Sequence, residues 1–287
     1  MPDLDTAHQF LAGTARVLDL RRFERLCLGG DAAPVRDAVA AYRNADGGFG
    51  QALEPDGRTP HSQPAAVEQA LRILDQADAW DGALVAGACD WLAATAPAEG
   101  GATFVAANIE GWPHAPWWQP EDGVPASLVS TGQIAGTLHV RAVEHAWLDR
   151  ATELMWELIG ALDEPHAYEL YGALRFLDHV PDRERAAAAL ERVEPAIRRV
   201  VTLDPDAPGE VHDPLGFAPA PGSIARPLFD DATIAAHLDH LAAGQQEDGG
   251  WTVNFPAWSP AAGADWRGVA TVDALHTLRE NGRLVLD

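Results

Sequence analysis

Apolar residues recur along most of the chain at the three- and four-residue spacing of an amphipathic helix. In residues 6–27, for example, Phe10, Leu11, Leu18 and Phe23 lie near one helical face. There is almost no strand signal, so the pattern predicts an all-α protein. The predicted helices cover residues 6–27, 32–43, a stretch after residue 60, 80–94, 127–140, 146–162, 165–179, 182–201, a stretch that starts near residue 230, and 269–281.

Two distant segments share one pattern, in which a helix ends at an Asp-Gly-Gly-aromatic turn and a loop leads to another helix. Residues 42–71 read YRNADGGFGQALEPDGRTPHSQPAAVEQAL, and residues 238–251 read LDHLAAGQQEDGGW. Glycine adopts positive φ readily, and aspartate can bond nearby amides, so both turns should reverse the chain. Phe49 and Trp251 should then bury their rings. We expect one all-α domain, residues 1–287, of about ten helices in antiparallel hairpins.

Two irregular segments interrupt the helices. Residues 97–126 form a loop of a length that is uncommon in compact domains and usually functional. Residues 203–227 contain six prolines and show no periodicity.

The net charge of the chain argues against two classes of binding partner. All 20 basic residues are arginine and the acids number 43, which gives a formal charge of −23. Such a surface repels nucleic acid and anionic lipid, so we expect neither as a partner. The abundance of Ala and Arg without Lys is typical of a GC-rich bacterial genome.

Cysteine usage and hydropathy bear on the location of the protein. Cys27 and Cys89 are isolated, so free thiols in a reducing cytoplasm are expected. The first ten residues lack the features of a signal peptide, and no apolar run is long enough to span a membrane. We therefore expect a cytoplasmic protein without membrane insertion.

At the two turns the chain resembles the terpenoid cyclase and protein prenyltransferase superfamily. QQEDGGW is similar to the Gln-Trp repeat of squalene-cyclase-like proteins. NADGGFG followed by PHSQPAAVEQAL is similar to the repeat of protein prenyltransferase β-subunits. The resemblance implies an α/α toroid, small or incomplete here, in which an inner ring of helices is wrapped by an outer ring. Helices that follow the double-glycine loops would be inner ones, and their first residues would face a central cavity.

The chain departs from the catalytic motifs of these families. The string LFDD at residues 228–231 has Leu where the acid motif Asp-x-Asp-Asp has its first Asp, and it precedes a helix of the outer type. Neither cysteine stands in the Asp-x-Cys context of the prenyltransferase zinc site, and no Asp-rich magnesium motif is present. We therefore expect no metal and no other cofactor.

The loop of the first repeat gathers four candidate residues before a predicted inner helix: Glu54, Asp56, Arg58 and His61. Acids near a helix N-terminus are favoured by the helix dipole even without a function, so capping and ion pairing explain them equally. As a site, Asp56 and His61 would be catalytic, and Glu54 and Arg58 would contact the substrate.

The segment NIEGWPHAPWWQPED is rich in tryptophan for a solvated loop. Its rings could form core at one end of the helices. Alternatively, the segment could cover a cavity, with the rings lining it and the polar residues inside. Aromatic faces suit carbocations as well as sugars, and the sequence does not choose between them. The candidate binding residues are Glu110, His114, Trp117 and Trp118, together with Trp112.

The second half of the chain supplies the other candidates. Asp230 and Asp231 stand at a predicted helix start, where capping explains them, although a buried pair would contain one acid of raised pKa that could protonate an alkene. Trp266 and Arg267 occupy the place that corresponds to the His61 region. Arg267 could pair with Asp265 or hold an anionic group.

Three functions fit these observations. The first is a terpenoid-cyclase-like or prenyltransferase-like enzyme, a lyase or isomerase, that acts on a small hydrophobic, isoprenoid molecule by metal-independent acid-initiated chemistry. The second is a carbohydrate-active enzyme, a glycosidase or lyase, with paired carboxylates acting on an oligosaccharide. The third is a non-catalytic toroid that binds a ligand. Both catalytic interpretations require residues 110–122 to close over the loop, with Trp117 or Trp118 in contact with the His61 region.

Overall fold

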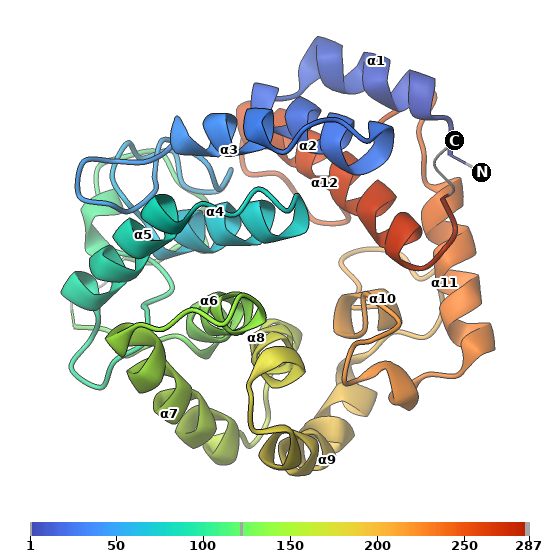
Figure 1. The fold of residues 1–287 in the computed structure, drawn as a ribbon. Helices are drawn as coiled ribbons and strands as arrows, with labels where there is room; N and C mark the ends of the chain where they lie inside the picture. Colours follow the sequence, from blue (N-terminus) through green and yellow to red (C-terminus); the bar gives the residue numbers. More distant parts are fainter. Residues whose placement is uncertain (1, 121–122, 285–287) are drawn as a thin grey trace. The chain divides into compact units, whose positions relative to one another are not determined.

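The computed structural model describes residues 2–120 and 123–284, and these residues form helices joined by loops, without a β-sheet. The all-α class is therefore confirmed, whereas the closed toroid and the single domain over residues 1–287 stay predictions. Figure 1 shows the helices. They are α1 (Leu4–Thr14), α2 (Val17–Leu28), α3 (Ala33–Ala40), α4 (Pro64–Gln76), α5 (Gly82–Thr95), α6 (Leu128–Val140), α7 (Ala146–Ala161), α8 (Ala167–His179), α9 (Arg183–Val200), α10 (Pro214–Phe217), α11 (Asp231–Ala243) and α12 (Pro260–Glu280), with 3₁₀ helices at Ala107–Ile109 and Arg226–Leu228.

The chain groups into two compact units. The central unit is residues 39–199, and the terminal unit is formed by residues 1–38 together with residues 200–287. In the central unit α6 packs against both α4 and α8, while α5 and α7 pack beside them.

An ion-pair network joins the C-terminal ends of α4, α6 and α8 in the central unit. Arg141, just after α6, donates from Nε to Asp75 Oδ1 on α4 (2.7 Å) and from Nη2 to the Asp75 carbonyl oxygen (2.8 Å). Arg175 on α8 donates from Nη2 to Asp75 Oδ2 (3.2 Å). Because the three helices end at the same carboxylate, they run parallel, as successive inner helices of hairpins would.

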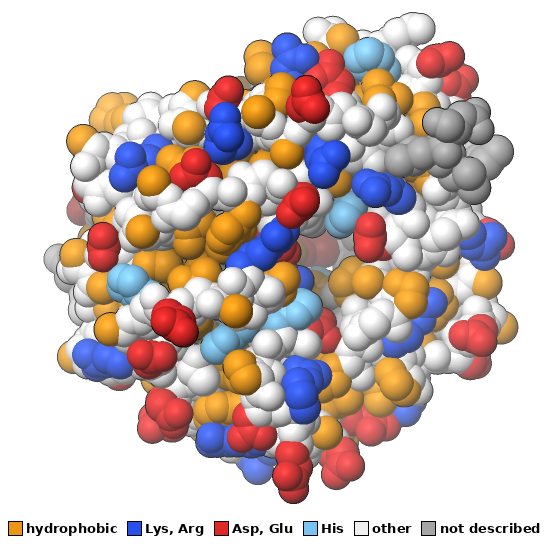
Figure 2. All heavy atoms as spheres, viewed as in Figure 1, with side chains coloured by type: hydrophobic (Ala, Val, Ile, Leu, Met, Phe, Trp, Pro, Cys, Tyr) orange, Lys and Arg blue, Asp and Glu red, His pale blue; other side chains and the backbone are white. Residues whose placement is uncertain are grey.

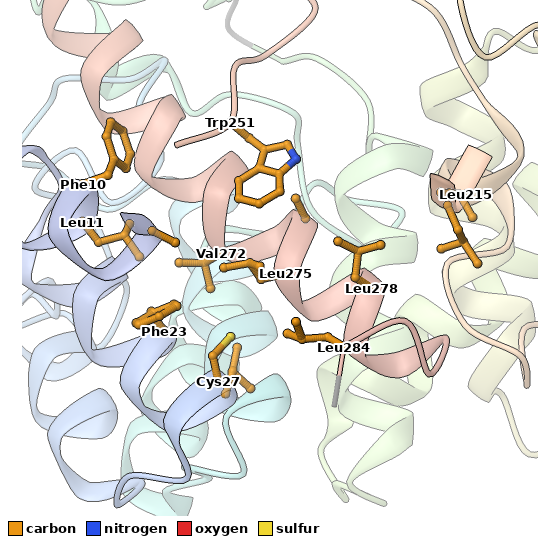
Figure 3. Close-up of a cluster of buried hydrophobic side chains, with 14 of the residues drawn as sticks. Phe10, Leu11, Phe23, Cys27, Leu215, Trp251, Val272, Leu275, Leu278 and Leu284 are labelled. Carbon is orange, nitrogen blue, oxygen red and sulfur yellow. The ribbon is translucent and has the colours of Figure 1, made fainter. Parts of the chain in front are cut away.

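The terminal unit has its core between α1, α2, α11 and α12 (Figure 3). Phe10 and Leu11 of α1 and Phe23 of α2 face Val272 and Leu275 of α12, and all five side chains are buried. A separate buried network lies nearby: Arg22, which is fully buried, donates to Asp273 on α12 at 2.6 Å. The unit is therefore held both by apolar packing and by a charged pair that links α2 to α12.

The two double-glycine turns have the same geometry. Gly47 and Gly249 have φ of +92° and +91°, and the next amide donates to the turn aspartate: Gly48 N to Asp46 Oδ1 at 3.0 Å, and Gly250 N to Asp248 Oδ1 at 3.1 Å. The following aromatic residues are buried, as the sequence predicts; the exposed fractions of Phe49 and Trp251 are 0% and 4%.

The sequence misplaces two helix boundaries. The predicted helix over residues 6–27 is two helices, because the chain turns at Ala15 and Arg16, which have extended backbone between α1 and α2. The two pieces pack on each other, so each buries its own apolar stripe. The last helix begins at Pro260 rather than near residue 269. Its N-cap is Ser259, whose hydroxyl accepts a hydrogen bond from the Ala262 amide (3.1 Å).

Candidate functional site

The loop between the first turn and α4 is folded tightly back on itself. Gln51 and Ala52 both have positive φ, and a Cβ on Gly50 would lie 2.2 Å from the His61 carbonyl oxygen. Asn44 donates from Nδ2 to the Pro60 carbonyl (2.9 Å) and closes the base of the loop. This compact shape places the side chains of residues 53–56 inside, in contrast to the open polar loop that the sequence suggests.

Glu54 is a buried acid of the loop with a perturbed pKa. Its side chain is buried, with 8% of the residue exposed, and Oε2 accepts the Asp56 amide N–H at 2.8 Å. Burial raises the pKa of the Glu54 carboxyl well above its usual range, and the nearby charges of Asp56 and then Glu68 on α4 add to this rise. The backbone hydrogen bond from Asp56 opposes the rise. Glu54 therefore holds its proton to a higher pH than an exposed glutamate does.

Asp56 connects the loop to the tryptophan-rich segment. It is 6% exposed, and its Oδ2 accepts the indole N–H of Trp117 at 3.1 Å. The backbone adds further links: the Ala115 amide donates to the Asp56 carbonyl (2.8 Å), and the Arg58 amide donates to the Pro113 carbonyl (2.9 Å). The expected contact between this segment and the loop that ends at His61 is thus observed for Pro113, Ala115 and Trp117, whereas Glu121 and Asp122 lie outside the described residues.

The three tryptophans of the segment differ in burial. Trp118 is buried at 3% exposure and packs so closely on Gly57 that a Cβ there would lie 2.5 Å from its ring. Trp112, at 42% exposure, stands edge-on to His61 with ring centroids 5.9 Å apart, and Trp117 is 49% exposed. Of the three rings, Trp118 alone is buried, so the core interpretation fails for Trp112 and Trp117. These two half-exposed rings border the loop, since Trp112 contacts His61 and Trp117 bonds to Asp56.

The remaining polar candidates of this region lie at its edge. His61 and Glu110 are exposed, and Arg58 is half-buried. His114 forms an isolated bridge with Gly57, and its Nδ1 lies 2.7 Å from the Trp112 carbonyl oxygen, so its ring helps to shape the segment. Of the predicted residues, only Glu54 and Asp56 are therefore both acidic and buried.

The structure corrects the acid role considered for Asp230 and Asp231. Both side chains are exposed at the start of α11, in the terminal unit. Asp230 is its N-cap, because Oδ1 accepts the Thr233 amide at 2.7 Å, and this bond lowers the pKa of the carboxyl. A carboxyl group of lowered pKa in water is a poor proton donor. The capping interpretation is the correct one.

Arg267 is held by an acid, as the ion-pair interpretation predicts, but the partner differs. Its Nη1 and Nη2 donate to both carboxylate oxygens of Asp248, each at 2.8 Å, and its guanidinium lies 4.5 Å from the centre of the Phe10 ring. The predicted partner, Asp265, is therefore wrong, and the partner is Asp248. Trp266 stands edge-on to Phe255 at 5.4 Å. Arg267 thus locks the second turn to the start of α12.

Sequence reasoning missed two residues that shape the candidate site. Glu68, which lies on α4, raises the pKa of Glu54. Gln63 holds the chain just before the tryptophan-rich segment, since its Oε1 accepts a hydrogen bond from the Ala106 amide at 3.0 Å. Glu68 carries no sequence signal for this role, because it belongs to an ordinary helical pattern. Gln63 is at least marked by its place immediately before the helix start.

The described surface also has a hollow that lies apart from the Glu54 loop. This hollow, of about 310 Å³, lies in the central unit and is lined by acids of α7. On the face shown in Figure 2, acids and arginines are interspersed over the described atoms. Within residues 2–120 and 123–284, no three His, Cys, Asp or Glu side chains are grouped to hold a metal ion, and no helix is long and apolar enough to cross a bilayer.

Comparisons with known proteins bear on the fold alone. No family model matches the chain, and a search of curated proteins also finds no match. Among solved structures, the chain is similar to one described as a protein from Actinoplanes, with a TM-score of 0.60 and 15% sequence identity. The likeness covers 97% of this chain and 98% of that one, so it concerns the whole helical arrangement.

Proposed function

We propose that this protein is an acid-catalysing enzyme of terpenoid-cyclase-like type, a lyase or isomerase that acts on a small hydrophobic, isoprenoid molecule. Glu54 is the proton donor. The observation that carries the proposal is the burial of this carboxyl beside Asp56, with a pKa well above the usual range. General acid catalysis is most efficient when the pKa of the acid lies near the working pH, and burial with a neighbouring acid produces such a shift.

Asp56 has a different role in this proposal. Its carboxylate accepts the Trp117 indole N–H, and its charge disfavours ionisation of Glu54. Asp56 thus keeps the proton on Glu54, while its backbone fixes the segment that presents Trp112 and Trp117. These rings supply the apolar and cation-stabilising surface that an alkene substrate needs once it is protonated.

The experiment compares Glu54→Gln, Asp56→Asn and the wild type with geraniol, farnesol and squalene as substrates, and products are identified by gas chromatography and mass spectrometry. Glu54→Gln should abolish turnover, because the amide has no acidic proton. Asp56→Asn should reduce it by lowering the pKa of Glu54. Carbon-13 NMR of labelled glutamate should place the Glu54 titration well above that of the exposed glutamates. A Glu54 carboxyl that titrates with the exposed ones, or an active Glu54→Gln variant, would overturn the proposal.

A carbohydrate-active enzyme is the second candidate, favoured by the exposed rings of Trp112 and Trp117 next to two buried carboxyl groups. Glycosidases place their two carboxyl groups on opposite sides of the scissile bond. Glu54 and Asp56 are two residues apart and joined by a hydrogen bond, so both would lie on the same side of a bound sugar chain. This placement argues against the glycosidase candidate. Release of reducing ends from oligosaccharides, lost in both Glu54→Gln and Asp56→Asn, would favour this candidate.

A further inference from the structure

The contact between Trp117 and Asp56 combines an exposed ring with a buried acceptor. About half of Trp117 is exposed, at 49%, whereas Asp56 is 6% exposed and receives the indole N–H at 3.1 Å. The bond takes the indole N–H out of water, while about half of the residue stays exposed. Trp117 therefore behaves as an apolar body with one hydrogen-bond donor that is docked on a buried carboxylate.

The rest of the segment is fixed more firmly than this side chain. The amides of Arg58 and Ala115 form backbone hydrogen bonds that tie the segment to the loop, and Trp118 is buried against Gly57. Moving the whole segment would break all of these contacts. Turning the Trp117 side chain gives up its hydrogen bond to Asp56 and the contacts of its buried half, but it leaves these backbone bonds in place. A rotation of Trp117 is therefore a smaller change than moving the segment, and it takes the indole off Asp56 Oδ2.

We infer that Trp117 occupies the place of the polar end of the ligand, and that this site takes an amphipathic molecule with one hydroxyl or N–H donor on an apolar body. The inference rests on the proposed function only in calling that ligand a substrate. When the ligand arrives, its donor replaces the indole N–H on Asp56 Oδ2, and the Trp117 ring moves off Asp56 to lie against the apolar body of the ligand. The apolar body then lies against the vacated surface next to Glu54.

The first test removes the internal ring and supplies it from solution. In Trp117→Ala, indole should bind with one-to-one stoichiometry, measured by calorimetry or saturation-transfer NMR. Benzofuran has the same shape with an oxygen in place of the N–H, so it cannot donate to Asp56. Because hydrogen bonds to charged groups are the stronger ones, indole should bind about tenfold more tightly than benzofuran or better. Equal affinity for the two probes, or no binding of either, would overturn the inference.

A second pair of probes addresses the ligand class. Geraniol carries a hydroxyl donor and geranyl methyl ether does not, so Trp117→Ala should prefer geraniol. Wild type should bind geraniol more weakly than Trp117→Ala, because Trp117 must first leave Asp56. Trp112→Ala is the matched control: this ring is similarly exposed but packs against His61, so its removal should not create the indole site.

Two further variants keep the test decisive. If Trp117→Ala does not fold by circular dichroism, Trp117→Phe retains a ring without the N–H, and it should bind geraniol several-fold more tightly than wild type does. Unchanged affinity in Trp117→Phe would count against the inference. Glu54→Gln in the Trp117→Ala background should still bind indole while losing turnover. Lost indole preference in Trp117→Ala, with turnover of the otherwise wild-type protein still abolished by Glu54→Gln, would refute this inference alone. Retained indole preference in Trp117→Ala, with full activity of the Glu54→Gln single variant, would refute the proposed function alone.

Discussion

The double-glycine turns make a quantitative prediction about stability, because each first glycine meets a neighbouring helix. In Gly249→Ala the new Cβ would lie 2.2 Å from the Thr6 carbonyl oxygen on α1, at a φ of +91°. A left-handed conformation costs a non-glycine residue about 1–2 kcal/mol. Displacing packed backbone costs about 1–3 kcal/mol more. We therefore expect Gly249→Ala to lose about 2–5 kcal/mol of unfolding free energy.

A matched control separates these two contributions. Gly29, in the same unit, ends α2 with a φ of +70°, and a Cβ there would meet nothing within 4 Å. Gly29→Ala should therefore lose only the conformational part, about 1–2 kcal/mol. Gly47→Ala provides a second test, because its Cβ would lie 2.5 Å from the Gly87 carbonyl oxygen on α5.

The assay is urea unfolding followed by circular dichroism, together with thermal melts. At about 2–4 °C per kcal/mol for a chain of this size, Gly249→Ala should melt about 10 °C lower than wild type, and Gly29→Ala about 5 °C lower or less. If the two variants lost the same free energy, the contact with Thr6 would contribute nothing. If Gly249→Ala kept full stability, the positive φ and the close approach would both be refuted.

Three further predictions concern groups outside the candidate site. Burial raises the pKa of Cys27 to about 12 and of Cys89 to about 11, so Ellman's reagent at pH 8 should react slowly with both thiols until denaturant is added, and rapid reaction of the folded protein would contradict this. Asp75→Asn weakens the bonds to the two arginines at the ends of α6 and α8 and should cost about 2–4 kcal/mol in urea unfolding; a loss below about 0.5 kcal/mol would show that the network is only a surface feature. The hydrogen bonds from Arg267 lower the pKa of Asp248, so the stability that this carboxylate adds is present above the ordinary Asp pKa and is lost as pH falls through the lowered one; the melting temperatures of wild type and Asp248→Asn should converge in acid and differ at pH 7, and a constant difference would refute the linkage.

The features that sequence predicted well are those set by neighbouring residues. The turn at Asp46 and Gly47 needs positive φ and an aspartate acceptor within two residues, and both requirements can be read directly from the sequence. The break between α1 and α2 could not be read in this way. Apolar spacing continues across Arg16, and the choice between one long helix and a hairpin depends on packing between the two pieces.

The sequence predicted which segments form the candidate site, but not the burial and the pKa of each residue in it. The contact between the tryptophan-rich segment and the loop follows from the apolar character of the rings. Which acid has the raised pKa does not, because the pKa of Glu54 is raised by burial, by the charge of Asp56 and by that of Glu68 on α4. Similarly, nothing local distinguishes the buried Trp118 from the exposed Trp117; Gly57, some sixty residues earlier, determines the difference by leaving room for one ring.

The repeat extends beyond the turn to the helix against which each turn packs. Gly47 and Gly48 meet Gly87 and Trp91 on α5, which are four residues apart. Gly249 and Gly250 meet Thr6 and Phe10 on α1, also four residues apart. The turn before α12 therefore packs on α1 in the way that the turn before α4 packs on α5. The frame is thus the same in both copies, but the loop after the turn differs between them. After the first turn the chain inserts Glu54 and Asp56, whereas residues 252–259 after the second contain no acid. The buried acids therefore belong to one copy alone, so the geometry of the repeat does not require them, and this supports the role proposed for Glu54.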